Sequence, residues 1–88
     1  MPREEKVTRI IDGDTFETSR RKHPVRLPGV NAPEKGKKGV AQARKDLAAM
    51  ILGQEVVVKC VATDKYKKAV ANVKFGWNSV NKAMKEKL

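Results

Sequence analysis

The sequence predicts a single mainly β domain with helices, a five-stranded Greek-key barrel. Three observations support this prediction. Strand-like apolar runs, bounded by turn residues, recur five times along the chain. Helical spacing occurs once between the third and fourth runs and once, briefly, near the end. A length of 88 residues allows one small core. Barrels of this kind commonly bind oligonucleotides on one face and on their loops.

The first two strands are predicted as a hairpin. Residues 7–11 form an apolar, partly alternating run that stops at Asp12-Gly13-Asp14. Alternation resumes at residues 15–18. Because an Asp-Gly step favours hairpin turns, a tight reversal is expected there.

The third strand is predicted at residues 25–30, after a polar and basic turn at residues 19–23. Pro28-Gly29 interrupts it, which indicates an edge position or a bulge. The three strands then form a meander.

A helix follows Pro33, because apolar side chains recur at helical spacing until Gly53 ends the pattern. These side chains are Val40, Ala43, Leu47, Met50 and Ile51.

Two further strands and a short amphipathic helix complete the fold. Residues 55–61 and 69–75 are apolar and β-branched, with a lysine-rich turn between them. Residues 78–88 open with capping residues and place an apolar stripe on one face. Phe75 and Trp77 could stack on a base, but their positions favour packing in the core or a hydrophobic staple.

Composition favours a polyanionic partner. Twenty Lys+Arg against ten Asp+Glu give a net charge of +10, which suits nucleic acid, although lysines that only solubilise a small domain would give the same balance. Cys60 excludes an internal disulfide and is expected to be a small core side chain. No membrane span or signal peptide is visible, so we expect a soluble protein, either cytoplasmic or exported with its signal peptide absent from this chain. The sequence carries no signal for the oligomeric state, and a monomer is the default.

Polar residues in three segments admit two interpretations each. Asp12 and Asp14 could offer oxygen ligands to a hard cation such as Ca²⁺, or they could simply form a β-turn. Arg26 should lie on the face opposite its apolar neighbours, where it binds a phosphate or only faces solvent. Glu34 could be a catalytic carboxylate or an ordinary acidic residue ahead of a helix.

Taken together, the segments resemble the staphylococcal nuclease (thermonuclease) family. The resemblance rests on Ile10-Ile11-Asp12-Gly13-Asp14-Thr15, on residues 25–34 with Arg26-Leu27 and Asn31-Ala32-Pro33-Glu34, on Asp64-Lys65-Tyr66-Lys67-Lys68 and on Val80-Asn81. It implies an OB-fold-like barrel and a Ca²⁺-dependent endonuclease that cuts DNA and RNA to leave 3′-phosphates.

The resemblance also implies a role for each site residue. Asp14 would be a Ca²⁺ ligand, Asn31 would occupy the position of a second carboxylate ligand, and the backbone carbonyl of Ala32 would be a third. Glu34 would orient or deprotonate the attacking water.

Four further residues would contact phosphates. Arg26 and Lys68 would hold the scissile phosphate, with Lys68 standing where the family has arginine. Lys65 and Tyr66 would contact a neighbouring phosphate of DNA or RNA, which we expect to be single-stranded.

Several departures from the family pattern predict reduced activity. Asn31 removes one negative charge beside Ca²⁺ and should weaken metal binding. Lys68 keeps its charge but lacks the planar fork of arginine. Lys67 replaces a turn glycine, so we expect the loop to leave the positive-φ conformation and to redirect Lys68.

The chain is expected to be one domain over residues 1–88, truncated at its C-terminus relative to the family, with shallower substrate binding as a result. Two functions remain open. The first is a weakened Ca²⁺-dependent nuclease, and the alternative is a catalytically inactive nuclease-like module that binds nucleic acid.

Overall fold

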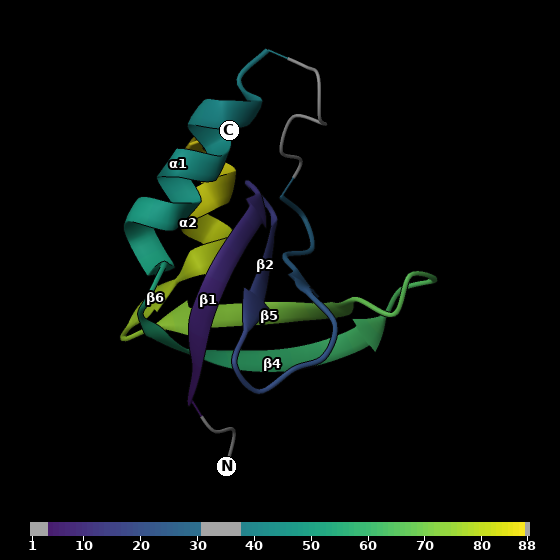
Figure 1. Ribbon diagram of the computed structural model, residues 1–88. Coiled ribbons are helices and arrows are strands. Elements are labelled where there is room, and N and C mark those ends of the chain that lie inside the picture. The colour runs from purple at the N-terminus through teal and green to yellow at the C-terminus, as the bar shows by residue number, and fades with distance from the viewer. Residues whose placement is uncertain (1–3, 31–37, 88) are drawn as a thin grey trace.

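The structure, a computed structural model, describes residues 4–30 and 38–87 and contains a five-stranded barrel with two helices. The elements follow one another as β1 (Glu4–Asp12), β2 (Thr15–Thr18), β3 (Val25–Arg26), α1 (Val40–Ile51), β4 (Glu55–Thr63), β5 (Ala69–Phe75), β6 (Asn78–Ser79) and α2 (Val80–Lys87) (Figure 1). The predicted barrel, with one helix between its third and fourth strands and another at the end, is confirmed.

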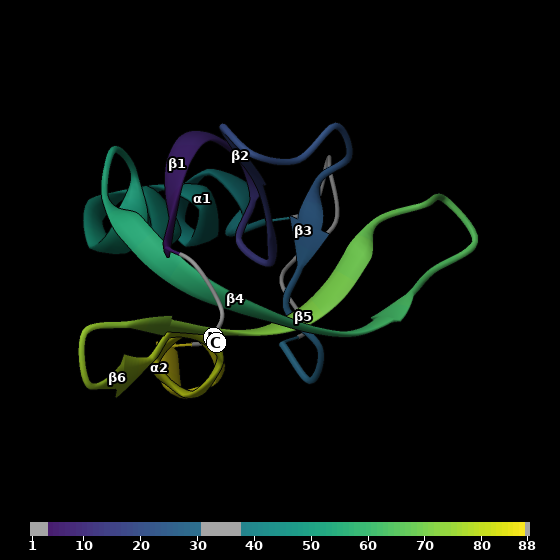
Figure 2. The same cartoon turned by 90° about the horizontal axis from the view of Figure 1, so that it is seen from below.

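The barrel closes because β3 pairs with both β2 and β5. The strand order is β3-β2-β1-β4-β5, and the additional β3–β5 pairing joins the two ends of the sheet. This closing pair is parallel and aligns Val25 with Ala69 and Arg26 with Val70. Figure 2 shows β3 beside β5, next to the loop that joins β4 to β5. Closure therefore brings Arg26 close to a turn that lies about forty positions later in the chain.

The core lies inside this ring and extends under the two helices. Helix α1 packs on β1, α2 packs on β5, and the two helices contact each other, as Figure 1 shows. Burial of apolar side chains from every one of these elements is the main stabilising force of such a domain. The largest fully buried apolar side chains are Phe16, Leu27, Leu47, Ile51, Met84, Val7, Val25, Val30, Val56, Val73 and Val80.

The third and sixth strands differ from the sequence prediction. Strand β3 has two residues rather than the six expected, because Pro28 has no amide hydrogen to pair and Gly29 has a φ of 75°. Strand β6 was not predicted. It forms a hairpin with β5 through the turn residues Gly76 and Trp77, and Gly76 has the positive φ, 61°, that the first position of a type II′ turn requires.

Two side chains predicted in the core are exposed. Trp77 is fully exposed, with a relative accessibility of 101%, because it occupies the tip of the β5–β6 hairpin. Cys60 is also exposed, and its thiol donates to the carbonyl of Ala62 across 3.2 Å. The end of β4 extends beyond the barrel in Figure 2, and residues 59–63 are all exposed. Phe75 is partly buried against the core, as expected.

Helix α1 begins and ends close to the predicted positions. It ends at Ile51, and Gly53 follows with a φ of 78° and donates its amide to the carbonyl of Val7 at 2.9 Å. This bond ties the end of the helix to β1. Neither helix in the described residues has the length and apolar character needed to span a bilayer.

Candidate functional site

The site begins with Arg26 on the outer face of β3. Its neighbours Val25 and Leu27 are buried, so strand alternation turns the arginine outward, as predicted, with 44% of its side chain exposed. Pairing of Thr15 with Arg26 between β2 and β3 places Asp14 beside it. Arg26 Nη2 lies 3.8 Å from Asp14 Oδ2. The two side chains therefore form an ion pair at the edge of the barrel, in which the arginine is exposed and the aspartate is mostly buried.

Asp14 is held firmly at the start of β2. Its carboxylate is 13% exposed, and Oδ1 accepts a hydrogen bond from the hydroxyl of Thr15 at 2.9 Å. Its backbone carbonyl accepts the amide of Leu27 at 2.8 Å. A fixed carboxylate of this kind is the donor type that a hard cation such as Ca²⁺ prefers, so the residue fits the role of a metal ligand.

The β4–β5 turn carries the other part of the site and is organised by Asp64. Oδ1 of Asp64 accepts the amides of Tyr66 and Lys68, each at 2.9 Å. The backbone of Asp64 donates to the carbonyl of Lys68 and accepts from the amide of Lys67, both at 3.0 Å. Asp64 was not among the predicted site residues, although an aspartate that opens a turn is a known signal for such bonding.

Lys67 adopts the conformation that we expected it to avoid. Its φ is 65°, in the left-handed region that glycine favours. The bonds that Asp64 makes to both sides of the turn hold the lysine there despite the steric cost of a Cβ. The expectation that Lys68 is redirected is therefore wrong, because Lys68 lines the same pocket as Arg26.

This pocket has a volume of about 360 Å³ and is lined by Arg26, Asp64, Lys65, Tyr66 and Lys68. The ammonium groups of Lys65 and Lys68 lie 5.1 Å and 5.9 Å from the centre of the Tyr66 ring, within cation–π range. Three cationic side chains thus face one cavity, while Asp64 uses a carboxylate oxygen for the turn. Such a set of donors suits the oxygens of a phosphate group.

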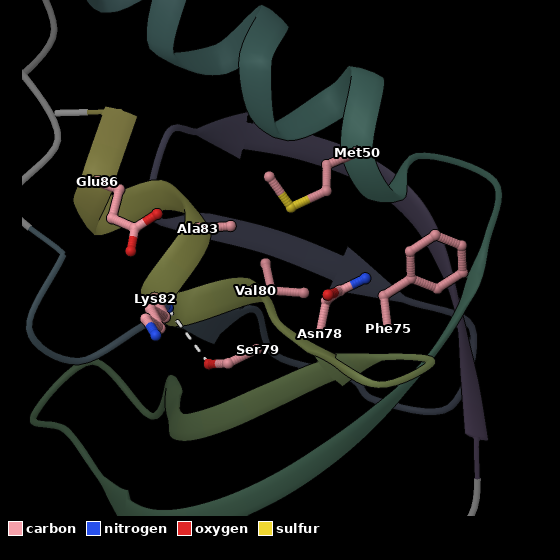
Figure 3. A pocket seen from close by; sticks show the side chains of 8 residues that line it. All are labelled: Met50, Phe75, Asn78, Ser79, Val80, Lys82, Ala83 and Glu86. Carbon is pink, nitrogen blue, oxygen red and sulfur yellow. Dashed lines mark hydrogen bonds between the residues drawn. The ribbon is translucent and has the colours of Figure 1, made fainter.

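A second pocket, of about 430 Å³, has a different character (Figure 3). Met50 of α1 faces Val80 and Ala83 of α2 across it. Among the described residues that line it, the charged ones are one lysine and one glutamate, Lys82 and Glu86. Basic side chains therefore gather in the pocket at the β4–β5 turn and not in the pocket between the helices.

Of the eight predicted site residues, the structure brings five together around the end of the barrel. These are Asp14, Arg26, Lys65, Tyr66 and Lys68. Asn31, Ala32 and Glu34 lie outside the described residues. Within residues 4–30 and 38–87, no three His, Cys, Asp or Glu side chains form a metal-binding group.

Comparisons with known proteins agree with this arrangement. The family model described as "Staphylococcal nuclease homologue" matches residues 24–87. Protein ParB of Escherichia coli is 41% identical over 69 residues, which cover 76% of this chain and 39% of ParB. Micrococcal nuclease of Shigella flexneri is 40% identical over 62 residues, which cover 68% of this chain and 36% of that enzyme. The chain thus spans less than two fifths of either relative.

Proposed function

Because the chain belongs to the staphylococcal nuclease family, we propose that it is a phosphodiesterase that cuts DNA or RNA within the strand. The observation that carries this proposal is the pocket that unites Arg26 of β3 with the lysines and tyrosine of the β4–β5 turn, beside Asp14. The net charge of +10 supports a polyanionic substrate.

Arg26 and Lys68 hold the scissile phosphate in this mechanism. Arg26 can offer two parallel N–H donors to two phosphate oxygens, and Lys68 adds a point charge. Charge accumulates on those oxygens in the transition state, so fixed donors lower the barrier more than they stabilise the bound substrate. Lys65 and Tyr66 contact a neighbouring phosphate and fix the register of the strand.

Asp14, Asn31 and the carbonyl of Ala32 would hold Ca²⁺. When bound, this cation would neutralise part of the phosphate charge. Asp14 fits this role as a fixed oxygen donor. Asn31 contributes a neutral oxygen, so the site has one negative charge fewer than a pair of carboxylates and binds the cation more weakly.

Glu34 takes a proton from the attacking water. The water oxygen forms the new bond to phosphorus while the bond from phosphorus to the 5′ oxygen breaks on the opposite side. The 5′ oxygen leaves with the electron pair of that bond and takes a proton from solvent water, so the products are a 3′-phosphate and a 5′-hydroxyl. The single-point contact of Lys68 and the neutral side chain of Asn31 make this reaction slower than a site with arginine and aspartate would.

A second candidate function is a module that binds nucleic acid without cutting it. Asn31 and Lys68 favour it, since both weaken groups that act on the reacting phosphate while leaving the basic surface in place. The two functions differ in metal dependence: cleavage requires Ca²⁺, whereas binding alone responds mainly to salt.

The proposed function is tested by replacing Arg26 beside a matched control. Arg26→Gln should reduce cleavage of single-stranded DNA in Ca²⁺ by about 10²- to 10³-fold, because one transition-state donor is lost. Arg9→Gln is the control, since Arg9 is a largely exposed arginine on β1 paired with Glu17. Chelator should abolish cleavage by the unchanged protein. Equal cleavage by both variants would overturn the assignment of Arg26.

A further inference from the structure

A third pocket, of about 260 Å³, lies between the β4–β5 turn and the loop that joins β2 to β3. We refer to it as the flanking basic pocket. Its basic side chains are Arg21, Lys22, His23 and Lys67, and no aspartate or glutamate is among the described residues that line it. None of these residues belongs to the pocket that holds Arg26. We propose that the flanking basic pocket binds a further phosphate of the same single-stranded nucleic acid, beyond the two phosphates at the pocket with Arg26, an inference that rests on the proposed function.

The wall formed by the β2–β3 loop is built on a buried carboxylate. Glu5 of β1 is 5% exposed. It accepts two hydrogen bonds from Arg21, at 2.8 and 3.0 Å, and one from the hydroxyl of Thr18 at 2.8 Å. The charge of Arg21 is thus matched within the protein. Its role is to fix the loop, and the adjacent Lys22 and His23 remain exposed to meet a ligand.

A second bond attaches the same loop to β1. Arg20 Nε donates to the carbonyl of Glu4 at 3.1 Å. With the Glu5–Arg21 pair, two consecutive arginines hold the loop in place, which preorganises the cations that follow them.

The opposite wall is formed by Lys67. The β4–β5 turn divides its lysines between two pockets: Lys65 and Lys68 line the pocket with Arg26, whereas Lys67 lines the flanking basic pocket. The positive φ of Lys67 gives it this distinct position. A residue held in a sparsely populated conformation at a site is a reason to look for function there.

The two pockets are within reach of a single nucleic-acid strand. Lys67 and Lys68 are consecutive residues, so their Cα atoms are about 3.8 Å apart, and one turn forms a wall of each pocket. A strand that places its scissile phosphate at Arg26 and crosses this turn therefore meets Lys67 next. The charge of Lys67 strengthens substrate binding. This matters because the scissile phosphate is contacted by Lys68, which binds it less well than an arginine would.

The proposal predicts that long and short ligands respond differently. A single strand of about twelve nucleotides, within the range of an OB-fold site, reaches both pockets. A dinucleotide or inorganic phosphate occupies the pocket with Arg26 without crossing the turn. Binding would be measured in chelator, so that no ligand is cut, and at several salt concentrations.

The test compares two double variants that remove the same charge. Lys22→Gln with Lys67→Gln removes the two free cations of the flanking basic pocket, while Lys45→Gln with Lys82→Gln removes two exposed lysines on the helices. The first variant should weaken binding of the long strand by on the order of tenfold. It should lower the salt slope by about 1.4, since each phosphate contact on a single strand contributes about 0.7. Its affinity for the dinucleotide should stay unchanged.

Each outcome has a defined meaning. If both double variants lose the same affinity for the long strand, the loss reflects net charge alone and the flanking basic pocket is not a site. If the dinucleotide is weakened as much as the long strand, Lys67 acts through the pocket with Arg26 and the inference is also wrong. In either case the proposed function stands as long as Arg26→Gln still reduces cleavage. If the unchanged protein binds neither ligand in chelator, the inference about the flanking basic pocket fails, and the proposed function is decided by the cleavage test with Arg26→Gln. The single variant Lys22→Gln controls for an effect on folding, because Lys22 lies outside the turn that holds Lys67 at a positive φ.

Discussion

Lys67 shows the conflict between conformation and function at the scale of a single residue. A left-handed residue with a Cβ costs roughly 1–2 kcal/mol, and glycine removes this cost but loses about 0.5–1 kcal/mol in chain entropy. Lys67→Gly should therefore stabilise the protein by about 0.5–1 kcal/mol, measured by urea unfolding. The same change should weaken binding of the long strand, because it removes a cation from the flanking basic pocket.

Lys65→Gly provides the control for this prediction. Lys65 lies in the same turn, but its φ is not positive, so glycine brings no conformational relief there. Equal effects of the two glycines on the urea midpoint would contradict the account of the turn.

Single residues also show where prediction from sequence succeeds. The alternation of Val25, Arg26 and Leu27 was enough to place the arginine outside the barrel. The exposure of Trp77 was not predictable in this way. It depends on the two-residue turn between β5 and β6, and β6 has only two residues, too few to give a strand pattern. Cys60 lies in an apolar run that continues past the end of the core, and composition alone does not show where a core ends.

At the scale of elements, the β4–β5 turn depends on Asp64. Asp64→Ala removes the acceptor of two backbone amides and should destabilise the protein by about 1–2 kcal/mol. It should also weaken nucleic-acid binding, because Lys65, Tyr66 and Lys68 lose their fixed positions. Thermal unfolding and binding in chelator would measure the two effects.

Asp64→Asn separates hydrogen bonding from charge. The asparagine keeps a carbonyl oxygen for the two amides, so stability and binding should stay close to those of the unchanged protein. A loss as large as that of Asp64→Ala would mean that the negative charge, and not the acceptor, organises the turn.

The β2–β3 loop depends in the same way on Arg21. Removing one partner of a buried ion pair leaves the other charge unmatched, and 3–5 kcal/mol is typical of full burial. Because Arg21 is 29% exposed and Glu5 only 6% by side chain, a smaller loss of about 2 kcal/mol is expected for Arg21→Ala. Arg20→Ala, which removes one exposed bond to a backbone carbonyl, should change the urea midpoint much less. Equal losses would contradict the assigned role of Glu5.

Element prediction was best where periodicity and a stop signal coincide. Residues 40–51 and 69–75 have the expected type and boundaries, because each pattern ends at a glycine or a polar turn. Strand β3 was overestimated, since Leu27 and Val30 remain buried and apolar although the paired strand ends at Arg26. Burial of apolar side chains, which creates the sequence pattern, continues past Pro28. Pairing of the backbone, which defines the strand, ends before it.

For the whole molecule, barrel closure joins the parts of the site. The sequence indicated the residue types, and the family resemblance implied their roles. Their spatial proximity follows from the parallel β3–β5 pairing, which no local pattern predicts. The flanking basic pocket was missed for the same reason, because residues 21–23 and Lys67 are distant in sequence. The net charge of +10 was visible at once, but only the fold shows which basic side chains gather at the two pockets.

We propose that this chain is a nuclease and that Asn31 and Lys68 limit its rate. The most direct test measures cleavage of single-stranded DNA in Ca²⁺ and in chelator by the unchanged protein and by the Asn31→Asp, Lys68→Arg double variant. Slow Ca²⁺-dependent cleavage that rises at least tenfold in the variant is expected, since a metal-ligand charge and a bidentate donor are restored. If both proteins bind the strand and neither cuts it, the chain is a binding module and the claim is wrong.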